Sequence, residues 1–141
     1  MIGRREFASV GMAAGAMAAL GNSALAATGG HHDAMLECAK ACSDCQRECA
    51  MCSTHCANRV KEGKSDHMTT LATCQDCADF CSAAAQIVAR GGPFTGEICK
   101  ACAEACAKCG AACEKFPDDQ HMKQCAEECR KCEKACRAMI A

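Results

Sequence analysis

The sequence predicts an all-α protein, an antiparallel up-and-down four-helix bundle with a cysteine-lined core. Three observations support this prediction. Four segments rich in Ala, Lys, Glu and Gln are separated by short breaks that contain Gly or Pro. No window shows the alternating β-branched pattern that is typical of a strand. Cysteine recurs within each segment at steps of three or four residues, which places it on one helix face.

The chain begins with a predicted leader, residues 1–26, that resembles a twin-arginine export signal. Arg4 and Arg5 precede a phenylalanine and a weakly apolar run, and Ala24–Ala26 offers a small-residue cleavage site. The run is too short and too rich in Gly and Ala for a membrane anchor. We therefore expect residues 27–141 to be exported to the periplasm or an internal-membrane lumen, as one domain without an anchor.

The first two helices have recognisable ends. The first opens at Asp33 or His32 and runs to about Glu62, where a following glycine is a typical C-terminal stop. The second, capped by Ser65 or the next aspartate, runs to about Arg90, where a Gly-Gly-Pro sequence breaks it.

The third and fourth helices follow the same logic. Thr95 is the expected cap of the third, which runs to about Lys115 before a proline breaks the chain. Asp118 or Asp119 caps the fourth, which ends near Met139. The loops between these segments are short, so neighbouring helices are expected to be antiparallel.

Cysteine occupies the positions that Leu fills in an ordinary bundle. Residues 27–141 hold only ten Leu, Ile, Val and Phe side chains, few for a bundle of this length. All 18 cysteines would point into one shared tube, and each is a candidate metal ligand. They are Cys38, Cys42, Cys45, Cys49, Cys52, Cys56, Cys74, Cys77, Cys81, Cys99, Cys102, Cys106, Cys109, Cys113, Cys125, Cys129, Cys132 and Cys136.

Three explanations of the cysteine-bearing helix faces do not involve copper. A role as a small hydrophobe does not account for 18 cysteines at unbroken spacing. A disulfide-stapled structural module is the default for an exported chain, but cysteines three or four apart on one helix meet poor bridge geometry, which leaves bridges between helices. Zinc and iron–sulfur clusters want four ligands that converge on one point, rather than a continuous column.

The fourth explanation is Cu(I), and we prefer it. This soft ion favours thiolates and accepts two or three of them. One Cu⁺ per thiolate is neutral, so a column of Cu–S units can lie in a dry core, where an unpaired charge is costly. We expect storage of many Cu(I) ions per chain, on the order of one per Cys or somewhat fewer. A low-stoichiometry copper chaperone is the related alternative.

The charged residues argue against other functions. The net charge is −1, which disfavours nucleic acid or an anionic membrane as partner. Lys and Glu alternate on the faces without cysteine, as in a solvated helix surface. No nucleophile–His–acid set and no Gly-rich phosphate loop is present in the sequence, so no enzymatic activity is expected.

The cysteine-striped segments at 38–45, 74–81, 99–109 and 125–132 resemble the bacterial copper storage proteins. Together with the leader, the chain is similar to the exported branch, described in methane-oxidising bacteria. The resemblance implies a four-helix bundle filled with Cu(I), tetramers, no enzymatic activity and a copper supply for the particulate methane monooxygenase. One departure is the cysteine number, because 18 is nearer to the cytosolic branch.

The resemblance also implies His and Met ligands at an open mouth of the bundle. His31 and Met35 match that placement, because Met35 lies one turn and His31 two turns before Cys38 on the same face.

Other His and Met side chains are left open. Antiparallel packing would gather His67, His121 and Met122 at the opposite end of the bundle. They could form a second mouth, but we favour ordinary packing. Met139 would lie back at the first end, whereas Met51, His55 and Met68 are out of phase with the cysteines and are expected at the flank or surface.

Overall fold

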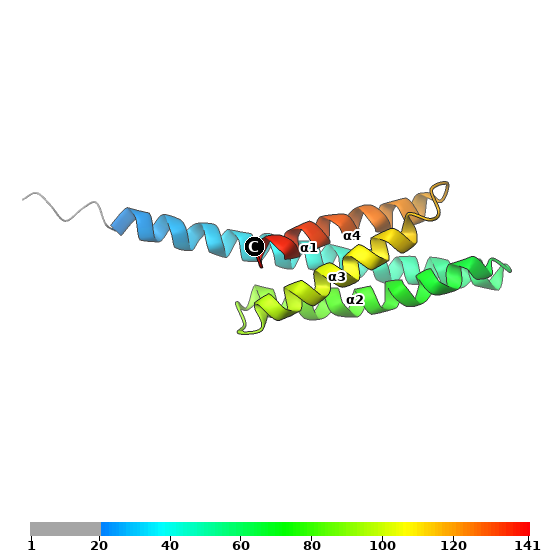
Figure 1. Cartoon of the computed structure of the whole chain (residues 1–141), viewed down its shortest axis with the longest axis horizontal. Helices are drawn as coiled ribbons and strands as arrows, with labels where there is room; N and C mark the ends of the chain where they lie inside the picture. The colour runs from blue at the N-terminus through cyan, green and yellow to red at the C-terminus, as the bar shows by residue number, and fades with distance from the viewer. Residues whose placement is uncertain (1–20) are drawn as a thin grey trace, which may run out of the picture.

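The computed structural model describes residues 21–141, with side chains from Gly29 onward. The elements are α1 (Gly21–Lys61), a short 3-10 turn η1 (Ser65–His67), α2 (Met68–Ala89), α3 (Thr95–Cys113) and α4 (Gln120–Ala138). The helices run alternately up and down, so the predicted all-α four-helix bundle is confirmed (Figure 1). Within the described residues, no helix combines the length and apolarity needed to cross a membrane.

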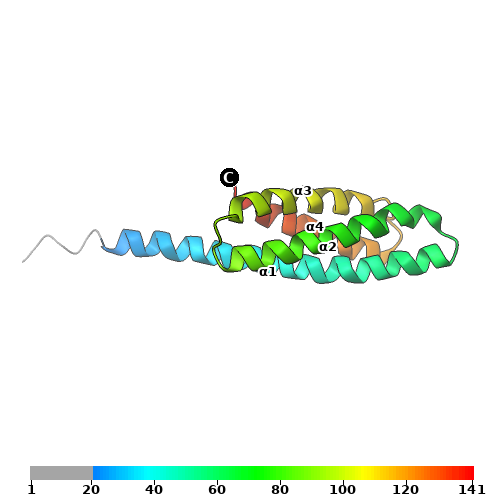
Figure 2. The same ribbon diagram turned by 90° about the horizontal axis from the view of Figure 1, so that it is seen from below.

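The four helices form a ring around one column of side chains. α1 packs against α2 and α4, and α3 packs against the same two helices. The diagonal pairs, α1 with α3 and α2 with α4, therefore face each other across the column. The N-terminal part of α1 projects beyond the other three helices, as both ribbon views show (Figures 1 and 2).

Helix α1 begins earlier than the sequence pattern predicts. It starts at Gly21 instead of Asp33 or His32. The physical reason is the short segment 24–27, Ala-Leu-Ala-Ala, because alanine and leucine have high helix propensity. The backbone is continuous helix through Ala24–Ala26, the predicted cleavage site, and the paired arginines of the predicted leader lie outside the described residues.

The C-terminal stops of the helices follow their expected signals, but only one expected N-cap, Asp119, is confirmed. The prediction that Ser65 or Asp66 caps the second helix is wrong, because both lie in the 3-10 turn η1 and α2 begins at Met68. Gly63 has φ +89°, and the Lys64 N–H donates to the Arg59 carbonyl at 3.0 Å, the bond that closes a helix before a left-handed glycine. Asp119 caps α4, as predicted, by accepting hydrogen bonds from two backbone N–H groups of the first turn. The prediction for Thr95 is wrong, because this residue is the first of α3 and its hydroxyl donates to the Gly92 carbonyl.

Candidate metal centre

The core of the bundle is a column of thiols. All 18 cysteines are free, and none is more than 1% exposed. Only two larger side chains are fully buried with them in the described residues, Met122 and Val88. The periodicity of the sequence therefore located the core correctly, residue by residue, although which cysteines bind metal stays a prediction.

Sulfur atoms from different helices are in contact throughout the column. Cys42 and Cys136 bring their Sγ atoms within 3.5 Å of each other, and the diagonal pair Cys81 and Cys132 within 3.9 Å. A disulfide bond is about 2.05 Å long, so these contacts are between separate thiols. The disulfide-stapled module has no support in this geometry.

The thiols form overlapping groups of four. Each group keeps its four Sγ atoms within 4.8 Å of one another, and neighbouring groups share members. Cys45, for example, belongs to one group with Cys49, Cys77 and Cys129 and to another that contains Cys81. Separate tetrahedral zinc sites need their own ligands and leave two negative charges each. Shared thiolates suit a continuous chain of Cu(I)–sulfur bonds.

The thiols of the column do not ionise alike. Hydrogen bonds with Cys136 and Cys42 lower the pKa of Cys38 to about 4. Hydrogen bonds with Cys102 and Cys132 raise the pKa of Cys136 instead. A thiolate is stabilised by S–H donors around it, and those donors then hold their protons more tightly. The thiols therefore cannot all ionise together unless a bound cation takes the place of their protons.

One end of the column, which we call the imidazole end, gathers three histidines and a methionine. The ring of His55 stacks on His121 at 4.7 Å between centroids, and its Nε2 lies 2.8 Å from a carboxylate oxygen of Asp119. His67 is 4% exposed and stacks on Phe116 at 4.0 Å.

Two buried nitrogens at this end have no hydrogen-bond partner among the described residues, Nε2 of His67 and Nε2 of His121. An unpartnered buried polar atom is unfavourable unless a ligand or ion satisfies it. A surface pocket of about 730 Å³ opens here and is lined by His55, His67 and Asp119. Solvent thus reaches the rings that border the thiols.

The imidazole end is electrostatically coupled to the first cysteines of the column. The neighbouring sulfurs of Cys52 and Cys74, and then the imidazoles of His67 and His55, lower the pKa of Cys56 to about 3. The Sγ atoms of Cys52 and Cys56 lie 3.6 and 3.8 Å from Sδ of Met122. The column therefore continues into this end without an apolar gap.

The sequence pattern undervalued this end. His55 was expected at the flank, although it precedes Cys56 and lies across from the start of the fourth helix in an antiparallel bundle. His67 and His121 were expected to pack as ordinary core residues. The available signal was that three histidines from three helix termini meet at one end of an up-and-down bundle.

The opposite end, which we call the apolar end, is closed by Val88 and by the partly buried Met35, Ile98 and Met139. A Cβ atom at Gly91, which has φ +59°, would lie 3.7 Å from Sδ of Met35, so this methionine packs on the turn between α2 and α3.

The two non-cysteine ligands predicted at this mouth lie near the apolar end but are not equally placed. Met35 is half-buried, whereas His31 is exposed.

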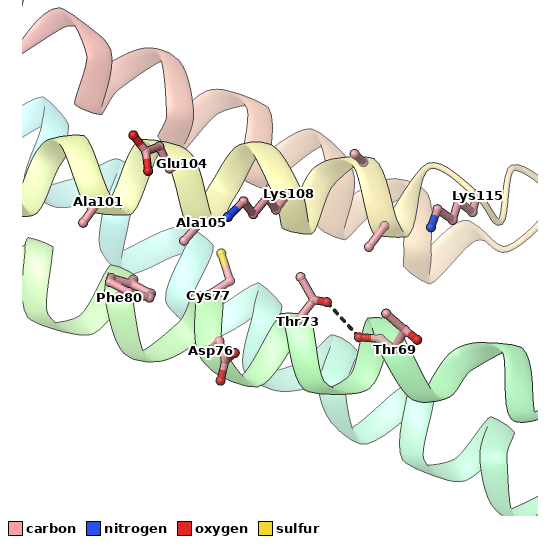
Figure 3. A pocket seen from close by; sticks show the side chains of 12 residues that line it. Thr69, Thr73, Asp76, Cys77, Phe80, Ala101, Glu104, Ala105, Lys108 and Lys115 are labelled. Atoms are coloured by element: carbon pink, nitrogen blue, oxygen red, sulfur yellow. Dashed lines mark hydrogen bonds between the residues drawn. The ribbon is translucent and has the colours of Figure 1, made fainter.

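A surface groove also reaches the column from the side. It lies between α2 and α3, has a volume of about 580 Å³, and meets the column at Cys77 (Figure 3). Its other lining residues are threonines, alanines, lysines, acidic residues and Phe80. With no imidazole or thioether in its lining, the groove does not resemble the imidazole end.

Solved structures similar to this chain are copper storage proteins. A cytosolic copper storage protein from Streptomyces lividans with five coppers has 32% identity and a TM-score of 0.73, with 79% of this chain and 96% of that chain covered. The same species' protein loaded with 10 copper equivalents has 32% identity and a TM-score of 0.70, with 77% and 84% covered. Apo copper storage protein 3 from Bacillus subtilis has 34% identity and a TM-score of 0.65, with 74% and 97% covered.

These relatives correct the predicted location. Export to the periplasm or an internal-membrane lumen is contradicted, because the Streptomyces lividans relative is a cytosolic protein. The physical reason lies in the cysteines and in α1. Eighteen free thiols are typical of a reducing compartment. The helix also runs unbroken through the expected cleavage site.

A family model extends the similarity to most of the chain. The model for the copper storage protein matches residues 31–141, which include all four cysteine-bearing helices. No curated protein matches the chain. The cysteine column, the bundle and the family match agree, and the chain belongs to the copper storage protein family.

Proposed function

We propose that this protein is a non-catalytic store that holds many Cu(I) ions on the thiolates of its core. The observation that supports this best is the continuous column of 18 free, buried thiols in overlapping groups of four. Cu(I) is soft and tolerates two- and three-coordinate thiolate sites, so shared sulfurs accommodate it. The load is expected to be on the order of one ion per Cys or somewhat fewer.

Each binding step exchanges a proton for copper. The incoming Cu⁺ forms bonds to sulfur, the thiols release their protons to water, and the copper stays Cu(I). The net charge of the buried column then stays close to neutral, which limits the desolvation penalty. Because no cysteine of the column is more than 1% exposed, bound Cu(I) is shielded from oxygen and from water.

The imidazole end is the proposed point of access. Its pocket is lined by His55 and the buried His67, and the unpartnered ring nitrogens of His67 and His121 are imidazole ligands of the kind that bind a soft ion. At the apolar end, Met35 remains a proposed ligand one turn from Cys38. His31 is the weaker candidate, because it is exposed.

An anaerobic Cu(I) titration of the reduced protein against a chromophoric chelator tests the store. We expect the protein to withhold more than about ten ions per chain from the chelator, since soft thiolates saturate one after another. A matched variant, Cys45→Ser, should lose about one or two ions, because Cys45 belongs to two of the groups. Saturation at one or two ions in the wild type would show a chaperone instead, and the absence of uptake would refute copper binding.

We also propose a homotetramer, on the basis of the family resemblance. An interface over the α2–α3 groove would cover the side chain of Phe80, which is 41% exposed there. Light scattering after size exclusion checks this, with Phe80→Lys expected to lower the measured mass. A wild-type monomer would refute it without affecting the copper store.

A further inference from the structure

The pocket at the imidazole end is lined by cationic side chains as well as by histidines. Arg59, Lys64 and Lys115 all contribute to its lining, and its volume of about 730 Å³ is in the range typical of small-molecule sites. The ion pairs that the described residues form at this pocket involve His55, Arg59 and His67, and neither lysine. The two ammonium groups are therefore available to a ligand.

The guanidinium of Arg59 is only partly hydrogen-bonded. Its Nη1 donates to a carboxylate oxygen of Glu62 at 2.8 Å, but its buried Nε has no partner among the described residues. Nε belongs to the edge of the guanidinium that can hold a carboxylate with two parallel hydrogen bonds. A buried donor without a partner is unfavourable unless a ligand satisfies it. The Arg59 side chain is 29% exposed, so a ligand in the pocket can reach it.

The acidic side chains of the pocket are mostly engaged already. Asp119 caps α4 and lies 2.8 Å from Nε2 of His55, and Asp66 lies 3.0 Å from Nδ1 of His67. Of the three carboxylates in the lining, only Asp118 makes no hydrogen bond among the described residues. The groups left free in the pocket are therefore mainly cationic donors, which favours an anionic ligand.

The free edge of Arg59 lies beside the start of the thiol column. Arg59 follows Cys56 by three residues and His55 by four on α1, and these spacings make side chains neighbours on a helix. His67, which is 4% exposed, lines the same pocket, and its Nε2 also lacks a partner. An anionic group held by Arg59 would therefore place the rest of its molecule next to the last cysteine of α1.

We propose that this pocket binds a small carboxylate-bearing thiol that carries Cu(I), with Arg59 as the anchor for the carboxylate. Lys64 and Lys115 would supply further positive charge. The thiol is the expected carrier because Cu(I) is soft and prefers sulfur. The proposal rests on the proposed function, because it requires that the column takes up copper, and it adds the chemical class of the copper donor.

The transfer is a ligand exchange at Cu(I). The copper–sulfur bond of the carrier breaks, and a copper–sulfur bond to Cys56 forms. The proton of the Cys56 thiol passes through water to the departing carrier thiolate, and no electron is transferred. Arg59 touches neither the copper nor the reacting sulfurs, so it acts as a positioning residue that holds the carrier beside Cys56.

The competing explanation is that Arg59 only forms an ordinary surface ion pair with Glu62. Such pairs contribute little to stability and need no ligand. The same helix offers a matched pair, because Arg47 lies 3.2 Å from Asp44, again three residues apart, and neither residue lines the pocket. Arg47→Gln is therefore the control for loss of one arginine and one ion pair.

Stopped-flow copper transfer to the reduced full-length protein tests the anchor. The donors are the Cu(I) complexes of N-acetylcysteine and of N-acetylcysteine amide, which share the thiol but differ in the carboxylate. With N-acetylcysteine, Arg59→Gln should lower the second-order rate constant about tenfold, because a charge-assisted pair of hydrogen bonds is lost. With the amide, the rate constant should be unchanged. Arg59→Lys keeps the charge without the planar fork and should lose only part of the rate. Arg47→Gln should transfer copper from both donors as the wild type does.

The outcomes separate this proposal from the store itself. Equal slowing with both donors in Arg59→Gln would show that Arg59 supports the structure of this end, and would refute carboxylate binding. Equal slowing with N-acetylcysteine in Arg47→Gln would show a general effect of charge and refute the anchor. Wild-type rates in Arg59→Gln would also refute it, while a normal copper capacity would leave the store intact. Lack of uptake by the wild type from either donor would refute the proposed function, and this proposal with it.

Discussion

The two ends of the thiol column have different surroundings. At the imidazole end, three histidine rings, a thioether and a surface pocket lie beside the outermost cysteines. At the apolar end, Val88 fills the position where the α2 cysteine face would continue, and methionine and isoleucine side chains pack over it. The column is therefore open to polar chemistry at one end and closed by hydrocarbon at the other.

This difference follows from the α2 sequence. The cysteine face of α2 holds Cys74, Cys77 and Cys81, and continues with Ala84 and Val88, both fully buried. The bundle has few large side chains to stabilise it without metal, so Val88 contributes packing where thiols are not needed. The polar atoms without hydrogen-bond partners, Nε2 of His67 and of His121, lie instead at the imidazole end, where an ion can bind them.

The largest expected effect comes from the apolar end. Val88→Ala should lower the free energy of unfolding of the apo protein by about 2 kcal/mol, from lost burial and the cavity that remains. The initial rate of copper uptake should not change, because access is at the other end. Urea unfolding and stopped-flow uptake measure the two quantities. Val60→Ala, at a half-buried valine of α1, is the control and should be milder. If Val88→Ala slowed copper uptake without lowering stability, the conclusion that this end is closed to copper would be wrong.

The second prediction concerns access. In His67→Phe/His121→Phe the rings remain but the nitrogens are lost, and we expect copper uptake to slow by about tenfold, equivalent to about 1.4 kcal/mol in barrier. The final copper capacity should be unchanged within about one ion, because the thiols are untouched. The measurement is stopped-flow transfer from a Cu(I)–chelator complex.

The matched control for access alters the other end. Met35→Leu/Met139→Leu keeps apolar volume and removes both sulfurs there. Its uptake rate should equal that of the wild type. If this variant is slow and the histidine variant is normal, copper enters at the mouth near His31 and Met35 instead.

Much of the fold was accessible from the sequence because one pattern repeats. Steps of three and four residues between cysteines define one helix face, and the structure places every one of those side chains in the core. The start of α1 was not accessible, since a short run of Ala and Leu is typical both of a leader and of a helix. The helix propensity of that run decides the structure, which begins at Gly21.

The imidazole end could be predicted only in part. Spacing places Met122 in phase with Cys125, and this residue is buried in the column. Spacing says nothing of His55, whose ring meets His121 only because α1 ends beside the start of α4. Stacking and unpartnered nitrogens depend on how helix ends and loops meet, which periodicity does not encode.

The third prediction uses the cap beside the histidines. Asp119→Ala removes the α4 cap and the contact with His55, and should destabilise the apo protein by about 1 kcal/mol at neutral pH. Asp119→Asn is the control, because asparagine keeps the cap hydrogen bonds and removes only the charge. Urea unfolding of both variants checks this, and equal losses in both would show that the charge matters more than the cap.

The charge of Asp119 also sets a pH dependence. Burial raises the pKa of Asp119, but hydrogen bonds from His55 and from the Met122 backbone outweigh it and hold the pKa below its usual 3.8. The charged form is therefore favoured by folding. Its contribution is present above pH 3.8 and is lost as the pH falls through the lower folded value. The stability difference between wild type and Asp119→Asn should disappear in that acid range.

The smallest effect is expected on the outside of the bundle, where neither end is involved. Arg130 of α4 reaches across α3, with both bonds to Glu114 at 2.8 Å, and lies over Gly110, where a Cβ would meet the guanidinium at 3.1 Å. This pair is substantially exposed, so Arg130→Gln should destabilise the protein by only about 0.5 kcal/mol, and less at high salt. Copper uptake and capacity should be those of the wild type. If Arg130→Gln slowed uptake as much as loss of the two imidazoles, the rate would reflect the stability of the bundle as a whole, and the distinction between an open and a closed end would fail.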